Sequence, residues 1–243
     1  MARPAKPLEQ EIRFINMKLI LIICLVIFVV WRITHYNDSP YVKERIKGRS
    51  EDQQAVIRYF CNKPGFLWKK PISDQEYDEM VSKILNKNDY RQKALYKIGL
   101  DETQVSEIEP VHFEGFQFDK NSFSKKGEDK KWRSSKYQIT WLFFSATQVF
   151  LYQNTFNLDE DGKKENTEEY FYKDITNFST STDTVETPEY DERERKTILV
   201  NVDANRFALT VPGDKFYCSM EQNEYTEAAI QGMKAMLRDK KNA

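Results

Sequence analysis

Six cationic side chains between residues 125 and 136 are the residues whose types and spacing most clearly suggest chemistry. They are Lys125, Lys126, Lys130, Lys131, Arg133 and Lys136. Glu128 and Asp129 lie among them, so the segment keeps a net charge of about +4. A polybasic segment gains about 1 kcal/mol per charge near an anionic membrane leaflet. We therefore predict a lipid- or anion-binding segment here, and the alternative is a solvated loop.

The other residues that could do chemistry form weaker patterns. Residues 159–162 begin like a calcium loop, but Lys163 and Lys164 stand where oxygen ligands should follow. The two histidines, His35 and His112, are far apart in the sequence. We recognise no nucleophile with its base, no acid–base pair in a motif and no phosphate-binding loop. The sequence therefore predicts no catalytic residue, no metal, no cofactor and no enzyme activity.

Composition limits the class of protein further. The chain has 243 residues and a formal net charge of -1, which argues against a nucleic-acid binder. Its three cysteines are Cys24, Cys61 and Cys218, and no Cys/His spacing typical of zinc occurs. Cys24 lies inside an apolar segment, so only the other two could pair. We expect structural thiols in a reducing compartment.

The longest apolar segment lies near the N-terminus, at residues 14–33. A membrane-spanning helix needs about 20 mostly apolar residues, and this segment reaches that length if Asn16 and Lys18 are tolerated near one end. Lys18 can extend its ammonium to the headgroups, and Trp31 suits the opposite interface. A cleavable signal peptide would end at small residues, which are missing here, and a buried core helix would carry a polar face. We expect a single-pass anchor in the lipid bilayer, preceded by a polar N-terminus at residues 1–13.

The orientation of this anchor follows from the basic residues that flank it. Five lysines and arginines lie between Arg32 and Arg49, and four lie between Arg3 and Lys18. Basic residues are enriched on the cytoplasmic side of membrane-spanning helices. The small excess favours a cytoplasmic location for residues 34–243.

Residues 34–110 have the pattern of a small helical module. Apolar residues recur at helical spacing over residues 51–61. Ser73 and Glu76 form a capping-box pattern that opens a second helix, and a third runs from Tyr90 to a stop at Gly99. Asp101 then caps a short turn. We interpret the apolar stripes of these helices as ordinary core packing.

At residue 111 the hydrophobic period changes from 3.6 to 2, which indicates strands. Seven strands are predicted, at residues 111–118, 137–144, 149–156, 168–176, 178–185, 197–202 and 206–211. Pro212 and Gly213 are expected to end the sheet. An amphipathic helix is predicted at residues 221–241, where its apolar stripe would close one open end of a bent sheet. The fold class is therefore α+β.

This order of elements resembles the bacterial form of the pleckstrin-homology superfold. The segments that carry the resemblance are KYQITWLFFSATQVFLYQNTF (136–156), EEYFYKDITNFS (168–179) and TILVNVDANRFALTVPG (197–213). The resemblance covers residues 111–243 and implies a seven-stranded bent sheet or partly open barrel with a C-terminal capping helix. In lipid-binding relatives the loop between the first two strands carries the phosphate-contacting cations, which matches the position of residues 125–136. The usual basic-x-basic ending is replaced here by Lys-Tyr-Gln-Ile.

Taken together, these features predict a single-pass, membrane-anchored binding or scaffolding protein that is not catalytic. Its β domain would contact an anionic lipid surface or a partner protein, and not nucleic acid. A fold by itself does not define a function, so two alternatives stay open. One is a membrane-bound hydrolase, which would need His112 beside a carboxylate and a hydroxyl. The other is an envelope-facing structural protein.

Overall fold

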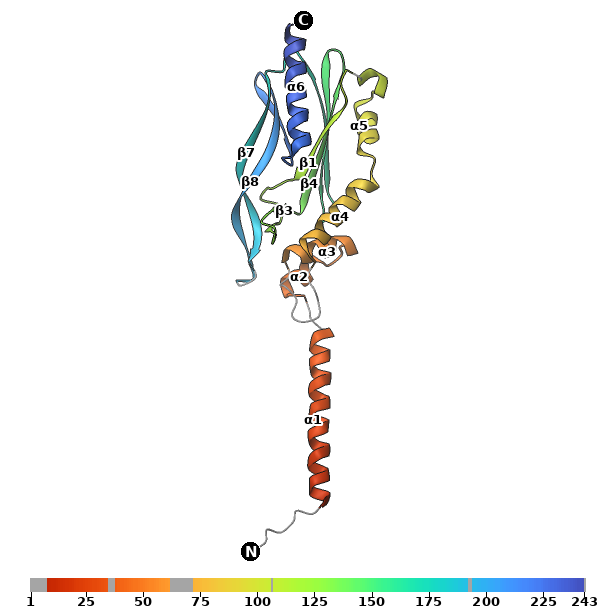
Figure 1. Cartoon of the computed structure of the whole chain (residues 1–243), viewed down its shortest axis with the longest axis vertical. Coiled ribbons are helices and arrows are strands. Elements are labelled where there is room, and N and C mark those ends of the chain that lie inside the picture. Colours follow the sequence, from red (N-terminus) through yellow and green to blue (C-terminus); the bar gives the residue numbers. More distant parts are fainter. Residues whose placement is uncertain (1–7, 35–37, 62–71, 106, 192–193, 243) are drawn as a thin grey trace.

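The structure is a computed structural model that describes residues 8–34, 38–61, 72–105, 107–191 and 194–242. Within this part of the chain it is a mixed α+β fold with two sheets and six α-helices (Figure 1). The α+β fold class is therefore confirmed. His35 lies outside the described residues, as do the side-chain surroundings of Trp31.

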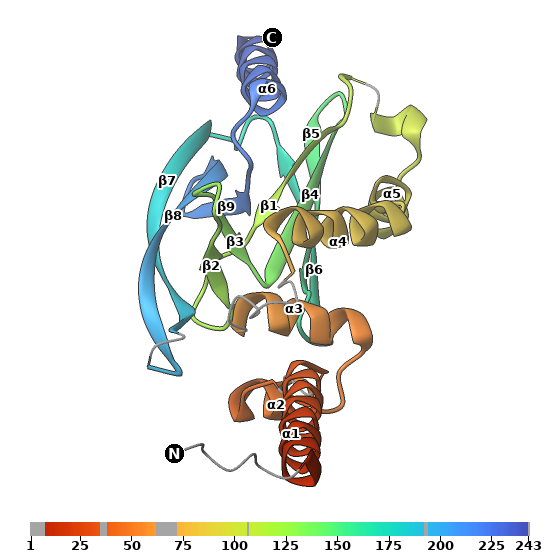
Figure 2. The same ribbon diagram turned by 60° about the horizontal axis from the view of Figure 1, so that its bottom comes forward.

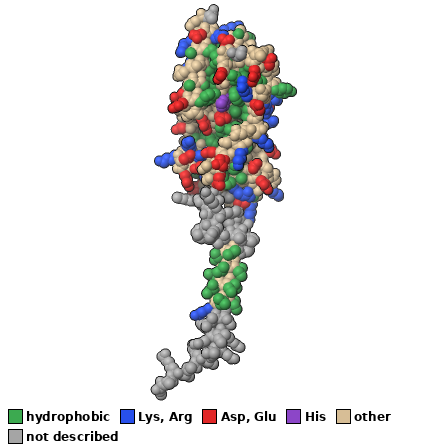
Figure 3. All heavy atoms as spheres, turned by 45° about the vertical axis from the view of Figure 1, so that its right-hand side comes forward, with side chains coloured by type: hydrophobic (Ala, Val, Ile, Leu, Met, Phe, Trp, Pro, Cys, Tyr) green, Lys and Arg blue, Asp and Glu red, His purple; other side chains and the backbone are tan. Residues whose placement is uncertain are grey.

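Helix α1 (Leu8–Thr34) contains the whole of the predicted helix at residues 14–33 and stands apart from the rest of the fold (Figure 1). Its described apolar side chains, from Met17 to Val30, are 45–65% exposed and give it a largely apolar surface (Figure 3). Among the helices of the described residues, none is both long and apolar enough to cross a membrane. The predicted helix is confirmed, whereas a membrane-spanning one is not shown.

The three helices predicted between the apolar segment and residue 110 are present as α3 (Glu51–Cys61), α4 (Asp74–Lys87) and α5 (Tyr90–Ile98), and the short turn is a 3-10 turn at Glu102–Val105. A further helix, α2 (Pro40–Arg45), was not predicted. Ser73 and Glu76 form the predicted capping box at the start of α4. Gly99 ends α5 in the left-handed region at φ +74°, where a residue with a Cβ would be strained.

Nine strands form the two sheets. The first sheet has the order β1-β4-β5-β6 and consists of β1 (Val111–Phe116), β4 (Lys136–Phe144), β5 (Gln148–Asn157) and β6 (Lys163–Phe171). The second has the order β3-β2-β7-β8-β9 and consists of β3 (Trp132–Ser134), β2 (Ser124–Lys126), β7 (Asn177–Asp191), β8 (Lys196–Val211) and β9 (Asp214–Ser219). All neighbours are antiparallel except β2 and β7. The described strands form no closed barrel.

The prediction of seven strands was wrong in several places. The strand predicted at residues 168–176 lies earlier, as β6 at Lys163–Phe171, and residues 172–174 form a turn. The basic connection is itself a short hairpin, β2–β3, whose turn is closed by hydrogen bonds between Gly127 and its neighbours. Residues 203–205, which separate the last two predicted strands, are instead continuous strand within β8. Each of these three residues pairs with a residue of β7. The chain turns instead at Gly213 (φ +87°) and continues into β9, so Pro212 and Gly213 do not end the sheet.

Two apolar cores share the first sheet. Its outer face carries Tyr137, Phe143 and Tyr152, which pack with the buried residues of α2 to α5. The helical segment and the sheet therefore bury their apolar side chains against each other. Figure 2 shows α4 and α5 lying along this face.

The second core lies on the opposite face of the first sheet. Helix α6 (Glu224–Asn242) packs between the ends of the two sheets and buries Ile230, Met233, Met236 and Leu237 there (Figures 1 and 2). A close approach at Gly115 joins β1 to the segment before α6. A Cβ at Gly115 would lie 3.3 Å from the backbone of Met220. The amide N–H of Glu221 donates to the carbonyl oxygen of Glu114 at 2.9 Å.

Candidate binding surfaces

The six predicted cations lie on the β2–β3 hairpin and the start of β4, but the protein itself uses half of them. Lys125 donates to the carbonyl oxygen of Tyr59 at 2.9 Å, and its ammonium lies 4.3 Å from the centre of that ring. Lys136 is held by both carboxylate oxygens of Asp119, at 2.8 and 3.0 Å. These two lysines are directed into the protein and not toward a ligand.

Arg133 is the most strongly committed of the six. Its side chain is buried and forms paired hydrogen bonds to Asp78, at 2.7 and 2.8 Å, and to Asp129, at 2.9 and 3.0 Å. Asp74 on α4 lies 3.8 Å away. The Arg133 guanidinium lowers the pKa of Asp129 to about 2, chiefly through these hydrogen bonds. Arg133 therefore fastens the hairpin to α4. The remaining three cations, Lys126, Lys130 and Lys131, are exposed and form no ion pair with the described residues.

The turn at residues 159–162 is tied to α3 and the segment before it. Arg49 forms an ion pair with Glu160 at 3.0 Å, and the Gln53 amide donates to Asp161 at 2.7 Å. Burial raises the pKa of Asp159. Across the described residues, no group of three or more His, Cys, Asp or Glu side chains is placed to hold a metal ion.

His112 lies on β1 against two aromatic side chains. Its ring stacks on Trp141 with the centroids 4.8 Å apart, and its Nδ1 lies 3.2 Å from the hydroxyl of Tyr225. Burial lowers its pKa. No carboxylate of the described residues hydrogen-bonds to this histidine, so the grouping that a hydrolase would need is not assembled there.

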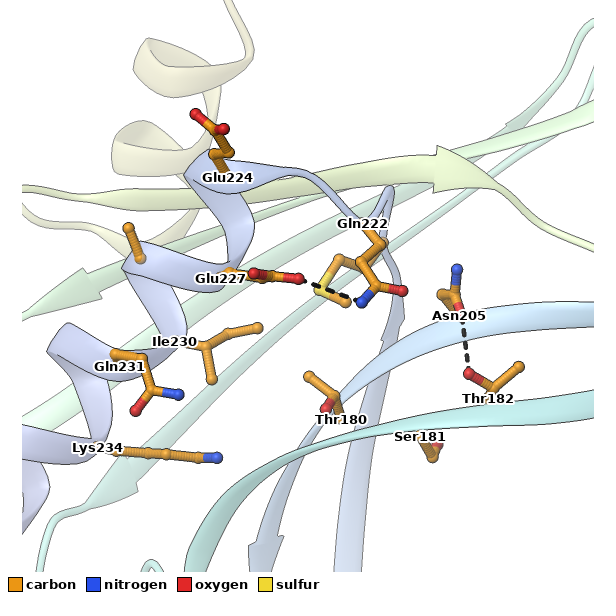
Figure 4. Close-up of a pocket in the computed structure, with 12 residues that line it drawn as sticks. Thr180, Ser181, Thr182, Asn205, Gln222, Glu224, Glu227, Ile230, Gln231 and Lys234 are labelled. Atoms are coloured by element: carbon orange, nitrogen blue, oxygen red, sulfur yellow. Dashed lines mark hydrogen bonds between the residues drawn. The ribbon is translucent and has the colours of Figure 1, made fainter. Parts of the chain in front are cut away.

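A groove that the sequence did not predict lies between α6 and the β7–β8 hairpin (Figure 4). It encloses about 510 Å³. One wall is α6 and the other is the middle of the hairpin; the lining residues are Glu224, Glu227, Ala228, Ile230, Gln231 and Lys234 on α6, Thr180, Ser181, Thr182 and Asn205 on the strands, and Met220 and Gln222 between them. Figure 4 shows Glu227, Ile230 and Lys234 extending from α6 toward the strands.

The strand that lines this groove has a free edge. The register pairs every residue of β7 with β8 on one side, but pairs β7 with β2 on the other side only at Glu189. Thr187 donates to the Ser122 carbonyl at 3.2 Å, and Ser124 donates to the Pro188 carbonyl at 2.9 Å. Over residues 177–186, β7 therefore has no second neighbour among the described strands. Three consecutive residues, 180–182, line the groove. Because successive side chains of a strand point to opposite faces, this is expected where the edge of the strand, and not only one face, borders the cavity.

The groove continues beyond α6 into a second cavity of about 360 Å³. Asn205, Met220 and Gln222 line both, so the two are contiguous. Phe118 and Trp132 give the second cavity an apolar part. An elongated ligand could thus lie along β7 and cross the hairpin toward β3.

Charges along the groove are ordered. Glu224 and Glu227 stand on the first turns of α6, and Lys234 stands further along the same face. None of the three forms an ion pair within the described residues, although Glu227 accepts a hydrogen bond from Gln222 at 3.2 Å. Glu221 lines the adjoining cavity, and together with burial it raises the pKa of Glu114. The acidic charges are therefore concentrated where the two cavities meet.

Sequence reasoning missed this groove because it depends on how α6 lies relative to β7. The local signals were present: residues 179–184 read STSTDT, and the Glu224, Glu227, Gln231 and Lys234 side chains recur on one face of α6. Such patterns ordinarily indicate solvated surfaces. Comparison with family models, with curated proteins and with solved structures found no match to this chain.

Proposed function

We propose that this chain is a non-catalytic binding protein that is held at a membrane by α1 and binds an extended segment of a partner protein along β7. The observation that carries the proposal is the unpaired edge of β7 beside the groove formed with α6. An exposed strand edge presents unpaired N–H and C=O groups, which another strand can satisfy. Peptides bind many domains in this way, with backbone hydrogen bonds giving affinity and side-chain contacts giving specificity.

The residues of this edge suit an added strand. Thr180, Ser181 and Thr182 are small or β-branched, and they leave room for a neighbouring backbone. Natural edges are commonly protected by lysine or proline, and between residues 177 and 187 β7 contains neither. Pro188 then lies where β7 meets β2.

The fold part of the proposal is a pleckstrin-homology-like domain at residues 111–243. Support comes from the succession of mostly antiparallel strands followed by one terminal helix that packs across the sheet ends. The nine strands and the short β2–β3 hairpin depart from the seven-stranded pattern. The remaining exposed lysines, Lys126, Lys130 and Lys131, are too few to support anionic lipid as the main ligand.

The membrane part of the proposal rests on α1. Its described side chains from Leu19 to Val30, Cys24 included, are apolar and exposed. Burying them in hydrocarbon would be favourable at about 25 cal/mol per Å². We propose that residues 34–243 face the cytoplasm. Alkaline phosphatase fused after Ala243 should be inactive and green fluorescent protein fluorescent; an active phosphatase would contradict this orientation.

Peptide display tests the binding site. The full chain in detergent micelles would be used to select from a library of random ten-residue peptides, together with Ala228→Trp and Ala235→Trp variants. Ala228 and Ala235 are both exposed on α6, but only Ala228 lines the groove. We expect peptides to be enriched on the wild type and on Ala235→Trp, and to be lost on Ala228→Trp.

A second measurement examines the binding mode. Backbone N-methylation removes a hydrogen-bond donor, so methylating alternate residues of a selected peptide should abolish binding at one set of positions and spare the other. Equal tolerance at every position would contradict strand addition. Failure to enrich any peptide on the wild type, or equal enrichment on Ala228→Trp, would overturn the proposed function.

A further inference from the structure

We infer that the segment bound along β7 carries a basic side chain and, three to five residues away in either direction, an acidic one. This inference rests on the proposed function, because the free edge of β7 and the groove beside it make the site. The charged side chains of α6 that line the groove would favour partner segments with complementary charges.

The spacing follows from the geometry of α6. Glu224 and Glu227 stand ten and seven positions before Lys234 on the side of α6 that lines the groove, and Glu227 is the carboxylate that Figure 4 shows extending toward the strands. At 1.5 Å per residue, these separations are about 15 and 10 Å. An extended chain advances about 3.3 Å per residue, so about three to five of its residues span these distances. A ligand strand lying along α6 would thus meet the carboxylates and the lysine at that interval.

The carboxylate end should contribute more than the lysine end. Glu224 and Glu227 are both exposed, and the structure shows no cation paired with either among the described residues. The adjoining cavity is lined by three carboxylates and two cations, so carboxylates are in excess there as well; they are Asp78, Asp203 and Glu221 against Lys131 and Arg133. A basic partner residue would reduce the repulsion within this group in addition to forming its own ion pair. Exposed ion pairs are individually weak, about twofold to fivefold in affinity.

An alternative reading of Glu224 and Glu227 is purely structural. Carboxylates in the first turn of a helix stabilise it through the helix dipole. That role does not depend on a ligand and would leave peptide selection unchanged when the charges are removed. The two readings therefore predict different results for the same variants.

The test repeats the peptide selection with charge variants of the full chain. On Glu224→Gln/Glu227→Gln the enrichment of lysine and arginine should disappear, whereas the acidic position should persist. On Lys234→Gln the acidic position should disappear and the basic one persist. Glu168→Gln/Glu169→Gln, two exposed carboxylates on β6, serves as the matched control and should leave both preferences intact.

Synthetic peptides then give the magnitude. When the basic residue of a selected peptide is replaced by glutamine, its affinity for the wild type should fall about twofold to fivefold. The same replacement should leave its affinity for Glu224→Gln/Glu227→Gln unchanged. Enrichment without any charge preference would overturn this inference and leave the proposed function intact. Absence of groove-dependent enrichment would overturn the proposed function first. If the full chain self-associates and Ala228→Trp abolishes the association, the occupant is a second copy of this chain and the inference is wrong.

Discussion

At the scale of single residues, Arg133 changes the interpretation of the basic segment. Sequence reasoning counted it among cations available to a ligand, whereas the structure surrounds it with Asp74, Asp78 and Asp129. The acidic partners come mainly from α4, about 55 residues earlier in the chain. No local pattern connects Arg133 with Asp74 and Asp78, so their pairing could not be predicted from the sequence.

Replacing Arg133 by methionine should destabilise the protein and leave peptide binding at β7 unaffected. The substitution keeps an apolar stem but leaves carboxylates without their partner, at a cost of about 3 kcal/mol in the free energy of unfolding. Urea denaturation measures this cost. Lys131→Met, in the same hairpin but exposed, should change stability by less than about 0.5 kcal/mol. A stable Arg133→Met variant with weakened binding to anionic vesicles would restore the lipid-binding interpretation.

Glu165 provides a test of pH dependence. It is paired with Lys93 on α5 and accepts a hydrogen bond from the Tyr152 hydroxyl at 3.1 Å. These contacts, the Lys93 hydrogen bond foremost, lower its pKa to about 2 in the folded state. The unfolded chain then binds this proton more tightly, so the stabilisation is present above about pH 4.5 and is lost as the pH falls toward 2.

Lys93→Met should therefore reduce the free energy of unfolding by up to about 1 kcal/mol at pH 6 and by only a small part of that near pH 1.5, below the folded-state pKa of Glu165. Denaturation curves at the two pH values measure the difference. Lys83→Met, at an exposed lysine of α4, should show no such dependence on pH. A Lys93→Met effect of equal size at both pH values would contradict the ion pair.

At the scale of elements, the segments with strong local signals were predicted well. The capping box of α4 and the glycine stop of α5 have their own hydrogen bonds within a few residues. The boundaries of β8 and β9 were not predicted, because Asp203 and Asn205 favour a turn locally and only the long partner strand β7 keeps them extended. Elements defined by their own residues are readable from sequence, and those defined by a distant partner are not.

Ser73→Ala should destabilise the protein by about 1 kcal/mol, since it removes the acceptor for the Glu76 amide at the start of α4. Thermal or urea denaturation gives the value. Ser82→Ala, at an exposed interior position of the same helix, should be neutral or slightly stabilising because alanine has the higher helix propensity. Equal effects at both serines would show that capping contributes nothing here.

At the scale of the whole molecule, two cores lie on opposite faces of the first sheet. Ile57 of α3 belongs to one core and Met233 of α6 to the other, and both side chains are fully buried. Strands β4 and β5 supply residues to each core. The helices of residues 40–105 and the β domain should therefore unfold together.

Ile57→Ala and Met233→Ala should each cost about 2–5 kcal/mol and shift a single, common unfolding transition. Near-ultraviolet circular dichroism and tryptophan fluorescence, recorded on the same urea titration, should report coincident midpoints. Separate midpoints for the two probes in either variant would indicate that the two parts unfold independently. Tyr96→Ala, at a highly exposed side chain of α5, is the control and should leave the midpoint unchanged.

The contact at Gly115 has a consequence for the order in which the protein is made. Strand β1 is complete only when the Glu114 carbonyl receives the amide of residue 221, which is synthesised more than a hundred residues later. During that interval the growing chain can form the first sheet and its helices but cannot join β1 to the segment before α6. Such distant contacts form slowly and leave strand edges exposed meanwhile. The time needed to synthesise residues 116–221 is therefore the shortest time for which this edge of β1 lacks its partner.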